Sequence, residues 1–277
     1  MDFEAIRQLV RTIPSIPTIS TRRCTGGNTP NADPRALHTW AARGYSQLGA
    51  DGILHKLFHD IGTTNKYYVE FGTQSGVECN TRRLREVCGW SGLLMDGGYA
   101  NASINLHKAF ITRENIASLF RKHGVPRTFD LLSVDIDGND YHVLREVLRQ
   151  GYAPRVVMVE TNFRVRTADA IIAYDPYYKG VFSVGNGCYG SASVAAFRAM
   201  MGARYTHVAS HKPDAYWVRN DVDQPIYEVP DISDEYCELA LSTTARGRHK
   251  PLHQVRSLSQ SRGARRLNRT KSVLVRV

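Results

Sequence analysis

The chain has 277 residues, of which 42% are hydrophobic and 22% charged, a balance typical of a globular protein. No apolar run approaches the ~20 residues needed to cross a bilayer, so no membrane span is expected. The first residues carry acidic side chains in place of a basic-then-apolar signal, so the sequence predicts a cytoplasmic location instead of secretion.

The charge is unevenly distributed. The chain holds 36 basic and 26 acidic residues, and ten of the basic ones but none of the acidic ones lie in residues 246–277. Residues 1–245 therefore carry 26 of each sign. This basic tail is expected to be disordered, and it is either a site for RNA or an acidic partner or only a solubilising extension. The closing SVLVRV is the one part of the tail that fits a short strand.

Five cysteines are scattered along the chain: Cys24, Cys79, Cys88, Cys188 and Cys237. Their number is odd and none forms a CxxC pair. The pattern predicts reduced thiols, with neither a disulfide framework nor a zinc site.

The predicted elements begin with a short amphipathic helix at residues 3–12, followed by an extended arm rich in Pro, Thr, Gly and Asn at 14–36. Apolar spacing predicts a helix at 50–61. Strands and helices then alternate, with strands at 66–71, 92–95, 109–112, 129–134 and 155–160 and helices at 80–88, 114–123 and 141–150. Three arginines of the 80–88 helix, Arg82, Arg83 and Arg85, are expected on a solvated face.

A loop rich in Tyr and Gly covers residues 163–190, and a helix is predicted at 191–201. Strands at 205–209 and 215–219, joined by SHKPD, predict an antiparallel hairpin at the sheet edge. The short, continuous apolar strands favour a doubly wound, Rossmann-like α/β sheet that is mostly parallel and ends in this hairpin.

Acidic residues stand where three of the predicted strands end: Glu70, Asp96, and the pair Asp135 and Asp137. Ligands of doubly wound sheets bind beyond these carboxyl ends. The stretch EFGTQSG at 70–76 permits a tight turn with close backbone approach, and Asp96 is placed to accept both hydroxyls of a ribose. The pattern predicts an adenosine ligand, although an ordinary strand-to-helix corner has similar glycines.

The residues of this stretch distinguish between two adenosine ligands, a dinucleotide and S-adenosylmethionine. Gln74 stands where a dinucleotide fingerprint has its middle glycine. Glu70 would repel a pyrophosphate but suits the ammonium of a methionine group. The expected cofactor is therefore S-adenosylmethionine.

The chain resembles class I S-adenosylmethionine-dependent methyltransferases, in particular the FkbM-type branch. The matching stretches are collinear: SQLGADGIL (46–54), YYVEFGTQSG (67–76), GWSGLLMDG (89–97), FDLLSVDIDGND (129–140) and PRVVMVETN (154–162). The resemblance implies methylation of hydroxyls on sugars or natural products. The family commonly has Glu where this chain has Asp137.

The resemblance also implies residue roles. Glu70, Gly72 and Gly76 would line the methionine end of the cofactor, Asp96 would bind the ribose, and Asp135 would lie beside the reacting methyl. Thr73 and Gln74 complete the expected cofactor site. The domain boundaries that follow are an N-terminal helix and arm at 1–44, a methyltransferase-like domain at 45–225, a connecting segment at 226–245 and the basic tail at 246–277.

An alcohol acceptor needs a base or a metal ion to lose its proton. Asp135 and Asp137 at one strand end, with Glu160 and Asn162 at the next, would offer four oxygen ligands to Mg²⁺. Alternatively, residues 137–140 are only a turn and helix cap. His142, one turn into the next helix, is a further candidate base beside Asp135 and Asp137, or an ordinary helix histidine.

Three functions remain open from the sequence. The first is O-methylation of a hydroxylated small molecule or glycan. The second is an RNA methyltransferase whose basic tail contacts phosphates. The third is a non-catalytic methyltransferase-like module that the tail docks onto a larger particle.

Overall fold

The computed structural model describes residues 16–26, 29, 31–162, 170–177 and 191–230 with their side chains, and residues 273–275 by their backbone. The predicted helix at 3–12, most of the loop at 163–190, and the tail apart from 273–275 lie outside the described residues, as do Cys188 and Cys237. Within the described residues, no helix combines the length and apolar character needed to cross a membrane.

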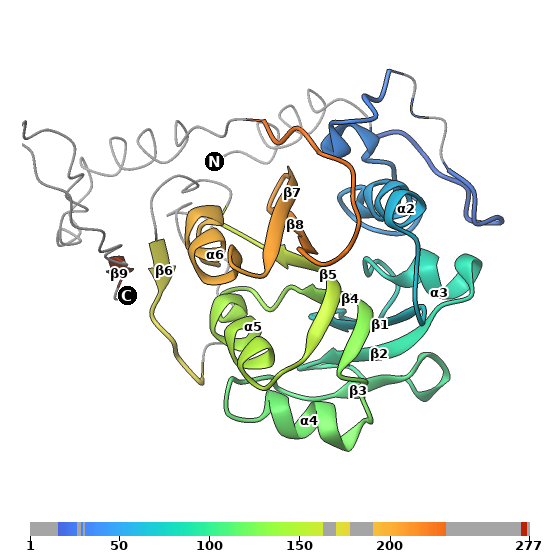
Figure 1. Ribbon diagram of the computed structural model, residues 1–277. Coiled ribbons are helices and arrows are strands. Elements are labelled where there is room, and N and C mark those ends of the chain that lie inside the picture. Colours follow the sequence, from blue (N-terminus) through green and yellow to red (C-terminus); the bar gives the residue numbers. More distant parts are fainter. Residues whose placement is uncertain are drawn as a thin grey trace, which may run out of the picture.

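A seven-stranded sheet in the order β3-β2-β1-β4-β5-β8-β7 forms the centre of the molecule (Figure 1). Five strands are parallel: β1 (Tyr67–Phe71), β2 (Ser91–Asp96), β3 (Leu106–Lys108), β4 (Thr128–Val134) and β5 (Ala153–Glu160). The antiparallel strand β8 (Asp214–Arg219) joins β5 to the edge strand β7 (Tyr205–His211). The fold is thus the predicted Rossmann-like sheet of methyltransferase type, ending in an antiparallel hairpin.

Helices cover both faces of this sheet (Figure 1). One face carries η1 (Leu37–Trp40), α2 (Ala50–Ile61) and α3 (Arg82–Cys88), and the other carries α4 (Ile116–Lys122), α5 (Asp140–Arg149) and α6 (Val194–Met201). Successive strand residues point to opposite faces, so Tyr68 packs with Phe58 in one core while Val69 packs with Phe120 in the other. Burial on both faces explains the continuous apolar strands of the sequence.

The predicted strand at 109–112 is wrong. The edge strand β3 lies just before it and pairs with residues 94–96 of β2. Asn105, with a φ of 54°, ends the short helix η2 (Ala102–Ile104) and turns the chain into β3. The apolar residues that follow serve other purposes, since Phe110 is exposed and Ile111 lines a pocket.

The predicted antiparallel hairpin is confirmed. Its turn is shorter than the predicted SHKPD and consists of Lys212 and Pro213.

A second, two-stranded ladder lies apart from the main sheet. Strand β6 (Ala170–Ile172) pairs in parallel with β9 (Val273–Val275) (Figure 1). The strand predicted within SVLVRV is therefore confirmed, and its partner β6 was not predicted.

Cys24 and Cys88 form a disulfide, which corrects the expectation of reduced thiols for this pair. The two residues are 64 positions apart, and only the folding of the arm onto α3 brings them together. Cys79 is a buried free thiol. Because disulfides are rare in cytosolic proteins, the cytoplasmic location stays a prediction. The expected solvated face of α3 is also wrong for Arg83, which is 1% exposed.

A buried ion pair fixes the amino end of β4. Asp130 accepts a hydrogen bond from Arg155 Nη1 at 2.8 Å and from the backbone N–H groups of Thr64, Asn65 and Lys66. Burial by itself raises the pKa of Asp130, but the bonds from Arg155 and these N–H groups outweigh burial and hold the pKa below its ordinary value. This carboxylate joins the loop before β1 to the sheet.

Candidate functional site

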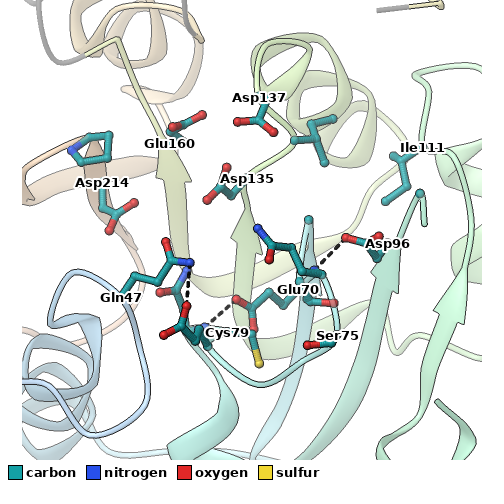
Figure 2. Close-up of a pocket in the computed structure, with 18 of the residues that line it drawn as sticks. Gln47, Glu70, Ser75, Cys79, Asp96, Ile111, Asp135, Asp137, Glu160 and Asp214 are labelled. Atoms are coloured by element: carbon teal, nitrogen blue, oxygen red, sulfur yellow. Dashed lines mark hydrogen bonds between the residues drawn. The ribbon is translucent and has the colours of Figure 1, made fainter. Parts of the chain in front are cut away.

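A pocket of about 1080 Å³ lies at the carboxyl ends of β1, β2, β4 and β5 (Figure 2). The strand order reverses between β1 and β4, which is where ligands of such sheets bind. The volume lies just above the ~300–1,000 Å³ usual for ligand sites. Seven carboxylates line the pocket: Glu70, Glu78, Asp96, Asp135, Asp137, Glu160 and Asp214. No lysine, arginine or histidine is among the described residues of its wall.

The glycine loop after β1 is shaped by close backbone contacts. Gly72 has a φ of 70°, and a Cβ atom there would lie 1.5 Å from the carbonyl oxygen of Asp135. Gly76 has a φ of 78°, and its Cβ would lie 2.6 Å from a methyl of Ile104. Gly72 is therefore required by its close contact with the backbone at the end of β4, and Gly76 is favoured by its left-handed conformation.

Asp96 joins the loops that follow β1 and β2. Its Oδ2 accepts the backbone N–H of Gln74 at 2.7 Å, and its Oδ1 accepts those of Gly98 and Tyr99 at 2.7 and 3.2 Å. A carboxylate offers about four acceptor positions, so Asp96 keeps capacity for a ligand hydroxyl. The structure thus brings the predicted glycine loop and the predicted ribose acid together at one side of the pocket (Figure 2).

Glu70 has a structural role that sequence reasoning missed. It is 2% exposed and accepts the backbone N–H groups of Asn80 and Thr81 and the Thr81 hydroxyl, at 2.7, 3.0 and 2.5 Å. Burial raises the pKa of Glu70, and these hydrogen bonds oppose that rise. The side chain fixes the start of α3 while it lines the pocket.

Thr73 presents an unused hydroxyl in the same loop. The residue is 4% exposed and lines the pocket, and its Oγ1 has no hydrogen-bond partner among the described residues. Buried polar groups are nearly always paired.

The opposite side of the pocket carries a group of carboxylates (Figure 2). One oxygen from each of Asp135, Asp140 and Glu160 lies within 4.8 Å of the others. Asp140 accepts the backbone N–H groups of Ile136 and Gly138, both at 2.8 Å. It therefore fixes the turn before α5, which is one half of the alternative to metal binding, whereas the helix has no side-chain cap hydrogen bond. Asp135 and Glu160 receive no such bond from a described backbone N–H.

Burial and like charge raise the pKa of this group. Burial followed by the charge of Glu160 raises the pKa of Asp135 well above its ordinary value, and burial followed by the charge of Asp140 raises that of Glu160. Burial followed by the charge of Glu70 raises the pKa of Asp214 to about 7. The charge of Lys212 opposes the rise at Asp214. Carboxylates with a raised pKa hold a proton or bind a cation more readily at neutral pH than ordinary ones do.

The predicted metal set is only partly assembled. Asp135 and Glu160 meet as expected, but their third neighbour is Asp140. Asp137 is exposed on the pocket wall with a φ of 60°. Asn162 is buried outside the pocket lining, and its backbone N–H donates to Ala192.

His142 lies away from the pocket. It is 7% exposed, and its Nε2 faces the carbonyl oxygen of Ile172 in β6 at 2.8 Å, so this nitrogen carries the proton. Burial lowers the pKa of His142. The imidazole ring joins α5 to β6 through this hydrogen bond. Its position therefore gives no support to the prediction that His142 is a catalytic base.

Sequence reasoning missed many of the lining residues, among them Gln47, Glu78 and Asp214. Asp214 was assigned to the hairpin turn, and only the antiparallel register that pairs it with Glu160 brings it to the pocket. Gln47 and Glu78 come from loops whose conformation no local pattern predicts. The one available signal was that Gln47 lies within SQLGADGIL, a stretch that carries the family resemblance.

No protein-family model matches the chain, and no curated protein matches it either. Among solved structures, it is similar to a chain from the crystal structure of a fibrillarin/Nop5p complex, with 13% sequence identity and a TM-score of 0.32. The similarity covers 63% of this chain and 80% of that one. A likeness this low says nothing of function, so the fold rests on the observed strand order and the site on its own geometry.

Proposed function

We propose that this chain is an S-adenosylmethionine-dependent methyltransferase of the FkbM type, which methylates a hydroxyl of a small molecule or glycan. The observation that carries the proposal is the junction of the glycine loop and Asp96 at the reversal of strand order. It supports the proposal because Asp96, which keeps acceptor capacity for a ribose hydroxyl, and Thr73 line the same large pocket.

The residues present fit the cofactor. Asp96 uses three of about four acceptor positions, which leaves capacity for a ribose hydroxyl. Glu70 is bonded by Asn80, Thr81 and Cys79, and would act on the ammonium through its negative charge. The Thr73 hydroxyl would donate to the methionine carboxylate. The pocket exceeds the size of most single-ligand sites, so room remains for an acceptor.

The charge of the pocket supports an acceptor without phosphate. Its described wall holds seven carboxylates and no basic side chain, and such a wall repels a phosphate backbone. RNA is therefore a poorer candidate for this pocket than a neutral hydroxyl compound. The basic tail, which lies outside the described residues, would have to overcome this repulsion.

When bound, S-adenosylmethionine supplies a methyl group already activated on a sulfonium. The chain's own task is to hold the acceptor oxygen in line and remove its proton. We infer that Asp135 or Glu160, in its ionised form, accepts that proton as the oxygen–carbon bond forms and the carbon–sulfur bond breaks. Mg²⁺, if used, would be held by Asp135 and Glu160 beside Asp140 and Asp137, and would lower the acceptor's pKa.

Calorimetric titration with S-adenosylhomocysteine tests the cofactor. The full chain is expected to bind it, and Asp96→Asn is expected to weaken binding by about tenfold or more, because a hydrogen bond to a charged group is lost. Asp221→Asn, an exposed change outside the pocket, is the matched control and should leave binding unchanged. Absence of binding by the unaltered chain would contradict the proposal.

The metal is tested separately. After dialysis against EDTA, added Mg²⁺ should raise the melting temperature of the unaltered chain but not that of a Glu160→Gln variant. Methyl transfer that survives EDTA unchanged would remove the metal from the mechanism and leave the cofactor assignment intact.

A further inference from the structure

The arm segment at residues 16–26 is attached to α3 in two ways. Cys24 is bonded to Cys88, the last residue of the helix. Arg83, also on α3 and 1% exposed, binds the backbone of the segment through its guanidinium group. It donates to the carbonyl oxygens of Ser20, Arg23 and Thr25, at 2.8, 3.1 and 2.6 Å. Disulfide and arginine therefore hold the same short stretch.

The arm segment is in turn joined to the pocket wall. Arg43 donates its N–H to the Pro17 carbonyl at 2.6 Å, and Ile19 donates its N–H to the Arg43 carbonyl at 3.1 Å. The side chains of Arg43 and Gln47 both reach Glu78, each at 3.2 Å. Gln47 and Glu78 line the pocket (Figure 2 labels Gln47). An unbroken series of contacts thus leads from the disulfide to the ligand site.

The stretch at residues 43–48 depends on this attachment from one side. On its other side, Asp51 of α2 accepts the backbone N–H groups of Gly44, Tyr45 and Ser46, at 2.8, 2.7 and 2.7 Å. Residues 16–19 supply the hydrogen bonds to the backbone of Arg43. Without the arm, the stretch would be held by Asp51, by Arg82 stacked on Tyr45, by the contact of His211 with the Leu48 backbone and by the exposed Glu78 contacts.

The disulfide is placed for exchange with a thiol. Cys24 is exposed, whereas Cys88 is 8% exposed, so an incoming thiolate reaches the sulfur of Cys24 and expels that of Cys88. Arg83 Nη1 lies 3.8 Å from the sulfur of Cys88. Its positive charge stabilises the departing thiolate.

We propose that the Cys24–Cys88 disulfide is a redox switch: in the oxidised state it holds the arm segment in place and so orders the pocket wall. A dithiol reductant donates two electrons and two protons, leaves as its own disulfide, and converts the pair to two thiols. The segment at 16–26 then loosens, the wall carrying Gln47 and Glu78 loosens with it, and the pocket binds its ligand less tightly. The inference rests on the proposed function only in the choice of ligand.

The experiment compares the full chain before and after treatment with dithiothreitol. Thiol labelling with mass spectrometry should show Cys24 and Cys88 blocked at first and free after reduction. Hydrogen exchange should then rise in residues 16–26 and 43–48 but not in β4 or β5. The dissociation constant for S-adenosylhomocysteine should rise about tenfold, within the usual range for coupling between two sites.

Two variants isolate the pair from the other cysteines. The double variant Cys24→Ser with Cys88→Ser should show the fast exchange at 43–48 without reductant and no response to it. The matched control, Cys79→Ala, keeps the disulfide. Because Cys79 lines the pocket, this variant is compared by thiol labelling and hydrogen exchange alone, and both should respond to dithiothreitol as in the unaltered chain.

Two outcomes would overturn the proposal: free thiols at Cys24 and Cys88 in protein purified without reductant, or equal hydrogen exchange at 43–48 in both redox states. If the oxidised chain binds no S-adenosylhomocysteine, the proposed cofactor fails. In that case the exchange measurement still decides whether the disulfide fastens the wall.

Discussion

The two ends of strand β4 carry aspartates of opposite character. At the amino end, Asp130 is fully buried and satisfied by Arg155 and by three backbone N–H groups. Just past the carboxyl end, Asp135 faces Glu160 and Asp214 across the pocket. The pKa of Asp130 lies below its ordinary value because hydrogen bonds outweigh burial, whereas burial and like charge raise that of Asp135.

This contrast separates a carboxylate that stabilises the fold from one that is available to a ligand. A paired, buried charge contributes through its partners and has no acceptor capacity left over. A buried acid close to other acids costs folding energy, and proteins keep such groups where a cation, a proton or a substrate compensates. The carboxyl end of β4 is therefore the end where chemistry is expected.

The largest expected effect is at the amino end. Asp130→Ala should lower the free energy of unfolding by about 3–5 kcal/mol, because Arg155 is left buried without its partner. Urea denaturation measures this loss. Asp221→Ala, whose partner Arg219 is at the surface, should cost less than about 1 kcal/mol. Similar losses in the two variants would show that the buried ion pair contributes no more to the free energy of unfolding than the exposed one.

A smaller effect is expected from Gly72→Ala. Its Cβ would collide with the carbonyl of Asp135, in addition to the strain of a φ of 70°. Gly89→Ala is the matched control, because Gly89 has a φ of 69° and open space around its Cβ. We expect about 1–2 kcal/mol for the control from strain alone and a further ~1–3 kcal/mol for Gly72→Ala. Equal losses would mean that the loop moves freely away from β4.

The smallest expected effect is in the pH dependence of stability. Asp214 has a pKa of about 7 when folded and about 4 when unfolded. The native state therefore binds the extra proton between these values, and the contribution of Asp214 to stability falls as the pH rises from about 4 to about 7. Asp130, with its lowered pKa, acts in the opposite sense, and its contribution is lost only as the pH falls below about 4.

The comparison with Asp214→Asn isolates this contribution. Burial lowers the pKa of His207 and of His211 to about 4, and these groups make stability rise over part of the same range. Both proteins contain these histidines, so their contributions cancel in the difference between the two free energies of unfolding. Denaturation from pH 5 to 8 in EDTA should show the variant gaining stability relative to the unaltered chain as the pH rises. A constant difference would contradict the raised pKa of Asp214.

The sequence by itself determined the order of the main elements, the mostly parallel sheet and the residues at its strand ends. Continuous apolar strands require cover on both faces, and parallel strands deliver their ends to one edge. Glu70, Gly72, Asp96, Asp135 and Glu160 therefore meet as predicted. These are consequences of periodicity and topology, which local residue types express.

Only the tertiary structure decided what each side chain does there. Glu70 fixes α3, His142 turns to β6, and Asp140 in place of Asn162 stands beside Glu160. It also brought Cys24 to Cys88 and buried Arg83 beneath the arm. Such contacts join residues distant in the chain, and their partners are chosen by the packing and register of whole elements. No local pattern of residues encodes that choice.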